Sequence, residues 1–189
     1  MLKNREIEVR VQVEDSAPLV DFLAKNGQLV SEEHQRDEYF SPAHRNFLDK
    51  KPVAEWLRLR SENGKHSMTY KNWHTQENGE SYYCDEYETS LGDIDQINKI
   101  FEALNMSSLI VVNKKRKVFA YKDYEIALDS VEDLGEYVEV EHKGECEESE
   151  IPRIAEEMKN FIEDLGCKIL TRDFEGYPLL LLKKKYERK

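Results

Sequence analysis

Apolar and charged residues alternate along several segments of this chain, and this period of two constrains the fold more than any other feature. Residues 5–13 read REIEVRVQV, with isoleucine or valine at every second position. The same alternation recurs around Arg58, Ile126 and Val138. Because successive side chains of a strand point to opposite faces of a sheet, each segment is predicted to form a strand with one apolar and one charged face.

Strands are predicted for most of the chain. Asn63-Gly64 and Asn78-Gly79 are typical turn pairs that separate such segments. No linker rich in proline or serine interrupts the chain, which favours a single domain over residues 1–189. The strands are expected at about 5–13, 28–40, 54–62, 65–72, 81–89, 108–122, 124–129 and 137–143.

Helices with a single apolar face are predicted between some of these strands. Residue patterns place them from a cap at Ser16 to Asn26-Gly27, from a cap at Asp93 to Leu104, and over 151–165. A short fourth helix is predicted near 179–185. Since each of the first three helices has one apolar face, each should cover the apolar face of a sheet.

The charges are segregated by strand, which indicates a function for the charged face. Glu-x-Glu occurs at residues 6–8, Arg-x-Arg at 58–60, and Glu-x-Glu again at 139–141. If the sheet curls into a barrel with the helices outside, these charges point inward and form a binding site. The alternative is an ordinary sheet with one face in water, and the pattern alone leaves it open.

Composition limits the class of protein further. The 189 residues carry 28 basic against 39 acidic side chains, a net charge of −11, which disfavours nucleic-acid binding. The longest aliphatic run, 179–182, is too short to span a membrane, and no apolar signal sequence follows Met1. Three scattered cysteines favour a reducing, cytoplasmic location over a disulfide scaffold.

The residue types predict a site for a metal-bound polyanion. Glutamates two apart on a strand can converge on one hard cation, which suits Mg²⁺ or Mn²⁺. Arg58 and Arg60, with Lys71 on the next strand, can hold phosphate groups, and each arginine can do so through two hydrogen bonds. An acidic wall facing a basic wall therefore favours a ligand with several phosphates and a bound cation.

At these positions the sequence resembles the CYTH, or triphosphate tunnel metalloenzyme, superfamily, which includes class IV adenylyl cyclases, thiamine triphosphatases and inorganic triphosphatases. The matching motifs follow one another in the family's order, and together they cover nearly the whole chain. They are Glu6-x-Glu8-x-Arg10, Arg58-x-Arg60, the basic Lys71, Glu86-x-Glu88, Lys114-x-Arg116 and the segment from Asp129 to Glu139-x-Glu141.

The resemblance implies an α+β fold in which a closed, antiparallel eight-stranded β-barrel forms a tunnel for a triphosphate and divalent cations. It implies metal ligands at Glu6, Glu8, Glu139 and Glu141, with Mg²⁺ or Mn²⁺ as the cofactor. It implies triphosphate contacts from Arg10, Arg58, Arg60, Lys71, Lys114 and Arg116. Catalytic roles then fall to Arg10, Arg58, Arg60 and Asp129, and a homodimer is expected because relatives commonly dimerise.

The predicted function is that of a class IV adenylyl cyclase, which converts ATP to cyclic AMP and pyrophosphate. The alternatives are a tripolyphosphatase or thiamine triphosphatase with the same tunnel, and a sensor that binds triphosphates without turnover. Arg10 stands where the family has a lysine, so this chain lacks an amine there that could serve as a general base. Cys84 stands where many relatives carry an arginine.

Three interpretations stay open at this point. Either Lys114 and Arg116 or Lys115 and Lys117 face inward, because a slip of one residue exchanges the two faces of a strand. Glu86 and Glu88 fit either the rim of a barrel or a metal role. The two tryptophans, at 56 and 73, fit either packing or stacking on a base.

Overall fold

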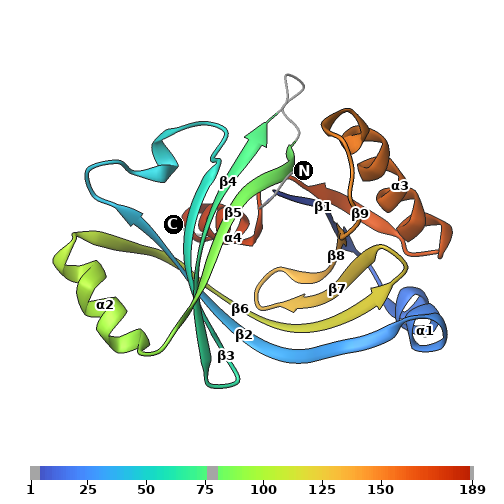
Figure 1. The fold of residues 1–189 in the computed structure, drawn as a ribbon, viewed down its shortest axis with the longest axis horizontal. Coiled ribbons are helices and arrows are strands. Elements are labelled where there is room, and N and C mark those ends of the chain that lie inside the picture. Colours follow the sequence, from blue (N-terminus) through green and yellow to red (C-terminus); the bar gives the residue numbers. More distant parts are fainter. Residues whose placement is uncertain (1–4, 76–80, 188–189) are drawn as a thin grey trace.

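The computed structural model describes residues 5–75 and 81–187, which form an α+β fold with a nine-stranded antiparallel sheet and four α-helices (Figure 1). The strands are β1 (Arg5–Val13), β2 (Gln28–Pro42), β3 (Glu55–Glu62), β4 (Lys65–Thr75), β5 (Ser81–Leu91), β6 (Met106–Tyr121), β7 (Tyr124–Val131), β8 (Gly135–His142) and β9 (Ile169–Asp173). The helices are α1 (Ala17–Asn26), α2 (Ile94–Ala103), α3 (Ile151–Asp164) and α4 (Tyr177–Glu187), with 3-10 turns at Phe47–Asp49 and Glu148–Glu150.

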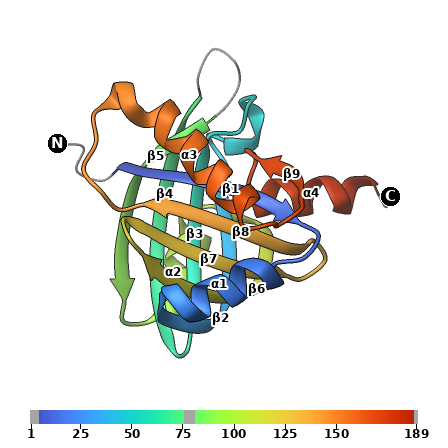
Figure 2. The same ribbon diagram turned by 90° about the vertical axis from the view of Figure 1, so that its right-hand side faces the viewer.

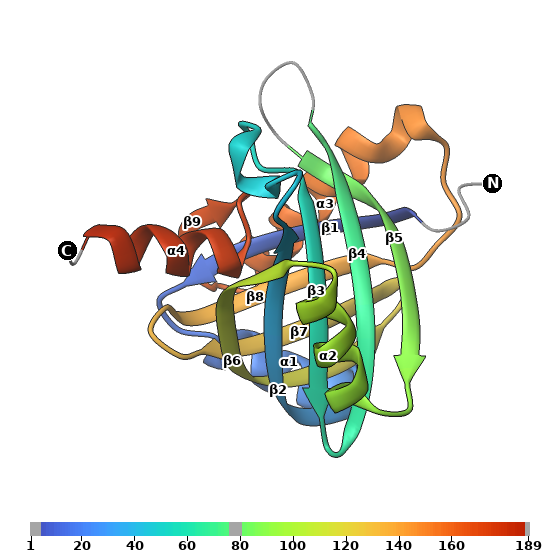
Figure 3. The ribbon, with the colours of Figure 1, turned by 90° about the vertical axis from the view of Figure 1, so that its left-hand side faces the viewer.

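The strands are ordered β5-β4-β3-β2-β6-β7-β8-β1-β9. β1 also pairs with β5, since residues 5, 6 and 7 lie opposite residues 85, 84 and 83. The first strand therefore contacts β8 along most of its length and β5 at its beginning. Figures 2 and 3 show the strands curving around a common interior, with α1 and α2 on different outer sides.

Most predicted elements are confirmed, with one correction to the strand count. The eight predicted strands are present, and a ninth strand that the sequence did not predict, β9, pairs with β1 from Arg10 to Val13. The fourth helix is longer than predicted, since α4 spans Tyr177–Glu187. The turn at Asn63-Gly64 is confirmed by positive φ angles at both residues. The turn predicted at 78–79 lies outside the described residues.

The predicted helix caps differ in outcome. Asp93 caps α2 as predicted, because its Oδ1 accepts a hydrogen bond from the backbone N–H of Gln96 at 3.0 Å. Ser16 precedes α1 but makes no side-chain cap bond. Instead the Asp15 carboxylate accepts a hydrogen bond from the Ala17 N–H at 2.8 Å. Among the described residues no helix is both long and apolar enough to cross a membrane.

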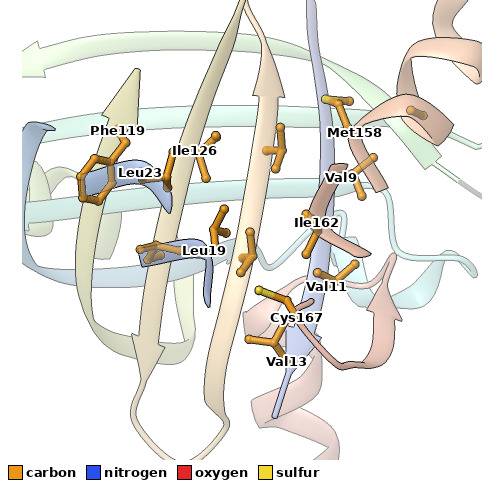
Figure 4. Close-up of a cluster of buried hydrophobic side chains, with 14 of the residues drawn as sticks. Val9, Val11, Val13, Leu19, Leu23, Phe119, Ile126, Met158, Ile162 and Cys167 are labelled. Carbon is orange, nitrogen blue, oxygen red and sulfur yellow. The ribbon is translucent and has the colours of Figure 1, made fainter. Parts of the chain in front are cut away.

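The main core lies between the apolar face of β1, β7 and β8 and the helices α1 and α3. Val9, Val11 and Ile126 from the sheet are fully buried, and Leu19 of α1 and Ile162 of α3 pack in the same cluster (Figure 4). Burying each such side chain contributes about 1.5–3 kcal/mol. Because the helices occupy this apolar face, the charged residues that alternate with it point to the opposite side of the sheet.

Candidate functional site

A charged cavity of about 290 Å³ lies on the sheet face opposite the main core. All of the strands from β1 to β8 supply side chains to it, and the segment from β9 to α4 adds more. Its lining is dominated by ionised groups of both signs. The cations are Arg10, Arg58, Arg60, Lys71, Lys114, Arg116 and Lys143, and the carboxylates are Glu8, Glu86, Glu88, Glu125, Glu139, Glu141, Asp173 and Glu175.

The β3 wall of the charged cavity is organised by Asp37 of β2, which is 1 % exposed. Arg60 donates to both carboxylate oxygens of Asp37 at 2.7 Å, and an Nη of Arg58 lies 3.8 Å from the same carboxylate. Burial alone would raise the pKa of Asp37, but Arg58 and Arg60 hold it well below its usual range. Asp37 is therefore an anion that fixes two cavity cations.

Arg58 retains hydrogen-bonding capacity that the protein does not use. Its Nη2 donates to the Thr69 hydroxyl at 2.9 Å and lies 3.5 Å from a carboxylate oxygen of Glu88. Its Nε is buried and has no hydrogen-bond partner among the residues that the structure describes. A buried donor without an acceptor is costly unless a ligand supplies one, so Arg58 is suited to an anionic oxygen in the charged cavity.

The wall formed by β6, β7 and β8 has a second buried carboxylate behind its cations. Arg116 donates to both oxygens of Asp129 at 2.6 Å and to Glu139 at 3.1 Å. The Lys114 ammonium lies 3.3 Å from Asp129. The Arg116 and Lys114 charges keep the pKa of Asp129 low although burial opposes this. The register that gives this arrangement pairs Arg116 with Asp129 across β6 and β7.

Lys114 holds its proton less tightly than an exposed lysine does. Burial lowers the pKa of Lys114 to about 8, and the neighbouring Arg116 charge adds to the effect. The nearby carboxylates Asp129 and Asp37 offset only part of this shift. Lys114 therefore changes charge within a pH range that is accessible to measurement, whereas the arginines around it do not.

Arg10 joins three carboxylates from different parts of the chain. Its Nη2 donates to Glu8 of the same strand, its Nε to Glu139 of β8 at 2.8 Å, and its Nη1 to Asp173 of β9 at 3.2 Å. The Arg10 guanidinium also lies 4.7 Å from the ring centroid of Tyr177. Burial would lower the pKa of Arg10, but Glu8 and the other carboxylates raise it further above its usual value. Arg10 is thus a permanent cation and cannot accept a proton.

Most of the predicted site residues meet in the charged cavity. The residues that line it as predicted are Glu8, Arg10, Arg58, Arg60, Lys71, Lys114, Arg116, Glu139 and Glu141. Asp129 lies behind Lys114 and Arg116 and does not itself line the cavity. Glu6 belongs to β1, but its side chain lies outside the described residues.

The structure fixes the register of β6 and places the other residues whose roles the sequence left open. Lys114 and Arg116 face the charged cavity, while Lys115 and Lys117 are exposed. Glu86 is a cavity residue and contacts the Lys71 ammonium at 2.6 Å. The two tryptophans, at 56 and 73, line the same cavity, and Trp56 packs edge-on against Tyr39.

Sequence reasoning missed several residues that shape the charged cavity. Asp37 and Tyr39 alternate along β2 in the same way as the recognised motifs, so the period of two could have identified them. Asp173 and Tyr177 carried no comparable signal. They reach the cavity only because β9 pairs with β1, and the short segment ILTRD has no alternation that predicts a strand.

Carboxylates of the charged cavity could hold a cation together with a phosphate ligand. Among the side chains that the structure describes, which do not include that of Glu6, no group of three or more Asp, Glu, His or Cys residues is close enough to hold an ion. Glu8 and Glu139 both line the cavity and are brought together by Arg10, to which both are hydrogen-bonded. Mg²⁺ is commonly bound by one or two carboxylates together with phosphate oxygens, and this donor set fits that pattern.

Fold and site together define an α+β protein whose antiparallel sheet carries matched cations and carboxylates on its inner face. The CYTH domain model matches residues 4–173. Since this covers most of the chain, the chain belongs to the CYTH family. A curated protein of Methanocaldococcus jannaschii named "Putative adenylate cyclase" is 29% identical over 162 residues, which cover 85% of this chain and 89% of that protein.

Solved structures share the fold. The protein PH1819 of Pyrococcus horikoshii has a TM-score of 0.79 at 25% identity, and the match covers 95% of this chain and 99% of that one. A protein of Hippeastrum has a TM-score of 0.64 at 18% identity, with 97% and 96% of the two chains covered. It is described as "Putative adenylyl cyclase HpAC1" with a dominant triphosphatase activity.

Proposed function

We propose that this protein is a metal-dependent enzyme that processes a triphosphate, and that its reaction is the conversion of ATP to cyclic AMP and pyrophosphate. The observation that carries the proposal is the convergence of six predicted phosphate contacts, from β1, β3, β4 and β6, on one cavity. They are Arg10, Arg58, Arg60, Lys71, Lys114 and Arg116. Membership of a family of triphosphate enzymes supports the same substrate class.

In the proposed mechanism, cations on both walls of the charged cavity bind phosphate oxygens, and a buried aspartate holds the cations of each wall in place. Arg58 and Arg60 bind phosphate oxygens, and Asp37 keeps their guanidinium groups in place. Lys114 and Arg116 do the same from the other wall, where Asp129 orients them. Catalysis then rests on position and on charge that is in place before the reaction begins, since the transferred phosphoryl group needs little else from the protein.

Glu8 and Glu139 would hold Mg²⁺ or Mn²⁺, with Glu141 and Glu6 as further predicted ligands. A bound cation supplies charge stabilisation and activation of the attacking hydroxyl. Both carboxylates form ion pairs with Arg10 in the absence of a ligand, so binding a cation requires these ion pairs to be broken or rearranged. A triphosphate that binds Arg10 would release them toward the cation.

We include in this proposal that eight strands close into a tunnel. The pairing of β1 with β5 over residues 5–7 supports closure, because these strands stand at opposite ends of the order from β5 to β1. β9 then lies outside the ring, against β1. A closed wall would surround the triphosphate and exclude water from it. The three unbridged cysteines suit the cytoplasmic location that belongs to the same proposal.

Hydrolysis of a triphosphate is the second candidate, and the Hippeastrum relative with triphosphatase activity favours it. The two reactions differ in the nucleophile, which is the ribose 3′-hydroxyl for cyclisation and water for hydrolysis. Arg10 cannot act as a base toward water, because its guanidinium is permanently charged. This favours cyclisation, whose hydroxyl is delivered by the substrate itself.

Product identification tests the proposal. The protein is incubated with ATP, tripolyphosphate and thiamine triphosphate, each with Mg²⁺ or Mn²⁺, and the products are separated by anion-exchange chromatography. Cyclic AMP with pyrophosphate supports the cyclase. Orthophosphate without cyclic AMP would contradict the cyclase and identify a triphosphate hydrolase. Tight binding without turnover of any substrate would contradict both enzymes and identify a sensor.

A further inference from the structure

Tyr177, the first residue of α4, places an aromatic ring within the charged cavity although it lies far along the chain from the predicted motifs. Its side chain is 4 % exposed, and it lines the cavity. The Tyr177 hydroxyl donates a hydrogen bond to Asp129 Oδ2 at 2.8 Å. This is the carboxylate that also accepts hydrogen bonds from Lys114 and Arg116. Tyr177 therefore contacts the group that orients one whole wall of the cavity.

The Tyr177 ring also lies next to two cations of the charged cavity. The Arg10 guanidinium carbon is 4.7 Å from the ring centroid and the Lys114 ammonium nitrogen is 5.1 Å from it. Both distances are within the range of cation–π attraction. The negative π-face of the ring attracts both cations. This attraction offsets part of the electrostatic repulsion between Arg10 and Lys114.

The chain fixes the Tyr177 ring from behind. Tyr137 of β8 packs against it edge to face, with ring centroids 4.9 Å apart. Asp173 Oδ1 accepts the backbone N–H groups of Glu175 and Gly176, both at 2.9 Å. Gly176 has a φ of +81°, which residues with a Cβ rarely adopt, so this turn directs Tyr177 inward at a position suited to glycine.

We propose that Tyr177 is a positioning residue of the charged cavity, whose ring holds Arg10 and Lys114 in place for phosphate and whose hydroxyl orients Asp129. This inference rests on the proposed function for its ligand, since it assigns to Tyr177 the alignment of cations that a triphosphate would contact. Tyr177 touches the cations, and it acts through them.

Two substitutions separate the ring from the hydroxyl without changing the charge of the cavity. Tyr177→Phe keeps the ring and removes the hydrogen bond to Asp129, while Tyr177→Leu removes both. Tyr186→Leu is the matched control, because Tyr186 belongs to the same helix and is 66 % exposed. Thermal unfolding of each variant shows whether it is folded at the temperature of the assay.

The first measurement is calorimetric binding of tripolyphosphate in the absence of metal. Tyr177→Leu is expected to weaken binding about tenfold and Tyr177→Phe about threefold, because Phe keeps the ring and loses only the hydrogen bond to Asp129, while Tyr186→Leu should bind as wild type does. With Mg²⁺ and the substrate that the product assay identifies, KM should rise in Tyr177→Leu more than kcat falls. Equal affinity in wild type and in folded Tyr177→Leu would overturn the inference.

The second measurement needs no triphosphate, so it separates failure of this inference from failure of the proposed function. The protein is acetylated briefly with an N-hydroxysuccinimide ester, and modification of Lys114 is quantified by peptide mass spectrometry. Tyr177→Leu should raise modification of Lys114 at least fivefold and Tyr177→Phe by less, since Phe keeps the ring beside Lys114, while Tyr186→Leu leaves it as in wild type. Unchanged modification in Tyr177→Leu contradicts the positioning role, whether or not wild type binds tripolyphosphate.

Discussion

Arg60 and Asp37 form a two-pronged ion pair across β3 and β2, with Nε to Oδ1 and Nη2 to Oδ2 both at 2.7 Å. Paired hydrogen bonds of this kind fix the plane of a guanidinium as well as its position. Arg58 shares the same carboxylate at 3.8 Å. A single buried anion thus sets the direction in which two arginines of the charged cavity point.

Replacing Asp37 by asparagine should disturb both arginines at once. Asp37→Asn keeps the size of the side chain but leaves two buried cations with less compensation, and removing one partner of a buried pair costs about 3–5 kcal/mol. The free energy of unfolding, measured by urea denaturation, should fall by about 3 kcal/mol, and tripolyphosphate affinity should fall with it. The control is Asp21→Asn, since Asp21 is exposed on α1. Equal stability of the two variants would contradict this account of Asp37.

Arg58 offers a second test, because lysine preserves its charge but not its shape. Arg58→Lys removes the guanidinium with its unpaired Nε, so a ligand oxygen loses the planar donor pair. We expect tripolyphosphate to bind about tenfold more weakly, which corresponds to about 1.4 kcal/mol. Arg36→Lys is the matched control, since Arg36 lies on the neighbouring strand β2 with a side chain that is 51% exposed. If both changes leave the affinity as it was, Arg58 is not a phosphate contact.

Glu8 and Glu139 can be tested as metal ligands with manganese as the probe. Glu8→Gln and Glu139→Gln each remove one anionic oxygen ligand, and hard divalent cations depend on such ligands. The Mn²⁺ concentration for half-maximal turnover should rise at least tenfold, and electron paramagnetic resonance should show less Mn²⁺ bound in the presence of tripolyphosphate. Chelation of the metal should abolish turnover in wild type.

The control for the metal test is Glu38→Gln, because Glu38 lies on β2 away from the charged cavity and accepts a hydrogen bond from Ser108. It should leave the Mn²⁺ dependence unchanged. If Glu8→Gln and Glu139→Gln both reach half-maximal turnover at the same Mn²⁺ concentration as wild type, the metal ligands are other residues.

The period of two allowed much of this fold and site to be predicted. It separated apolar from charged faces on β1, β3, β7 and β8, and the one-sided helices required the apolar faces for themselves. β6 was harder, because four successive basic residues, 114–117, give both faces the same charge. Val112 and Phe119 are both buried but face opposite sides, so apolar residues did not fix the register either.

The missed parts depend on contacts between distant segments. β9 pairs with the edge of β1, and its five residues, ILTRD, are too short a segment to show the alternation that identified the other strands. Asp173 and Tyr177 enter the cavity through that pairing and through the turn at Gly176. Local pattern could not reveal them, because their role is defined by the position of Arg10, which lies 163 residues from Asp173 along the chain.

Lys114 should make the tripolyphosphate affinity of the charged cavity depend on pH. Burial lowers the pKa of Lys114 to about 8, so the ammonium is charged below this pH and neutral above it. A phosphate contact needs the charged form, and tripolyphosphate affinity should therefore fall as the pH rises through about 8. The groups around it keep their charge in this range, since Asp37 and Asp129 have lowered pKa values and the pKa of Arg116 is raised.

Calorimetric titrations with tripolyphosphate at pH 6.5 to 9.5 measure this effect. Tripolyphosphate itself changes protonation state over this range. The association constant of wild type at each pH is therefore divided by that of Lys114→Arg, whose side chain stays charged throughout. This ratio should fall at least fivefold across the range. The pH dependence of stability is a second test. Between about pH 8 and pH 10.5 the unfolded chain retains the Lys114 proton that the folded chain has lost. Lys114 should then make the free energy of unfolding rise with pH relative to Lys114→Met. A constant affinity ratio together with parallel stability curves would show that Lys114 keeps the pKa of an exposed lysine.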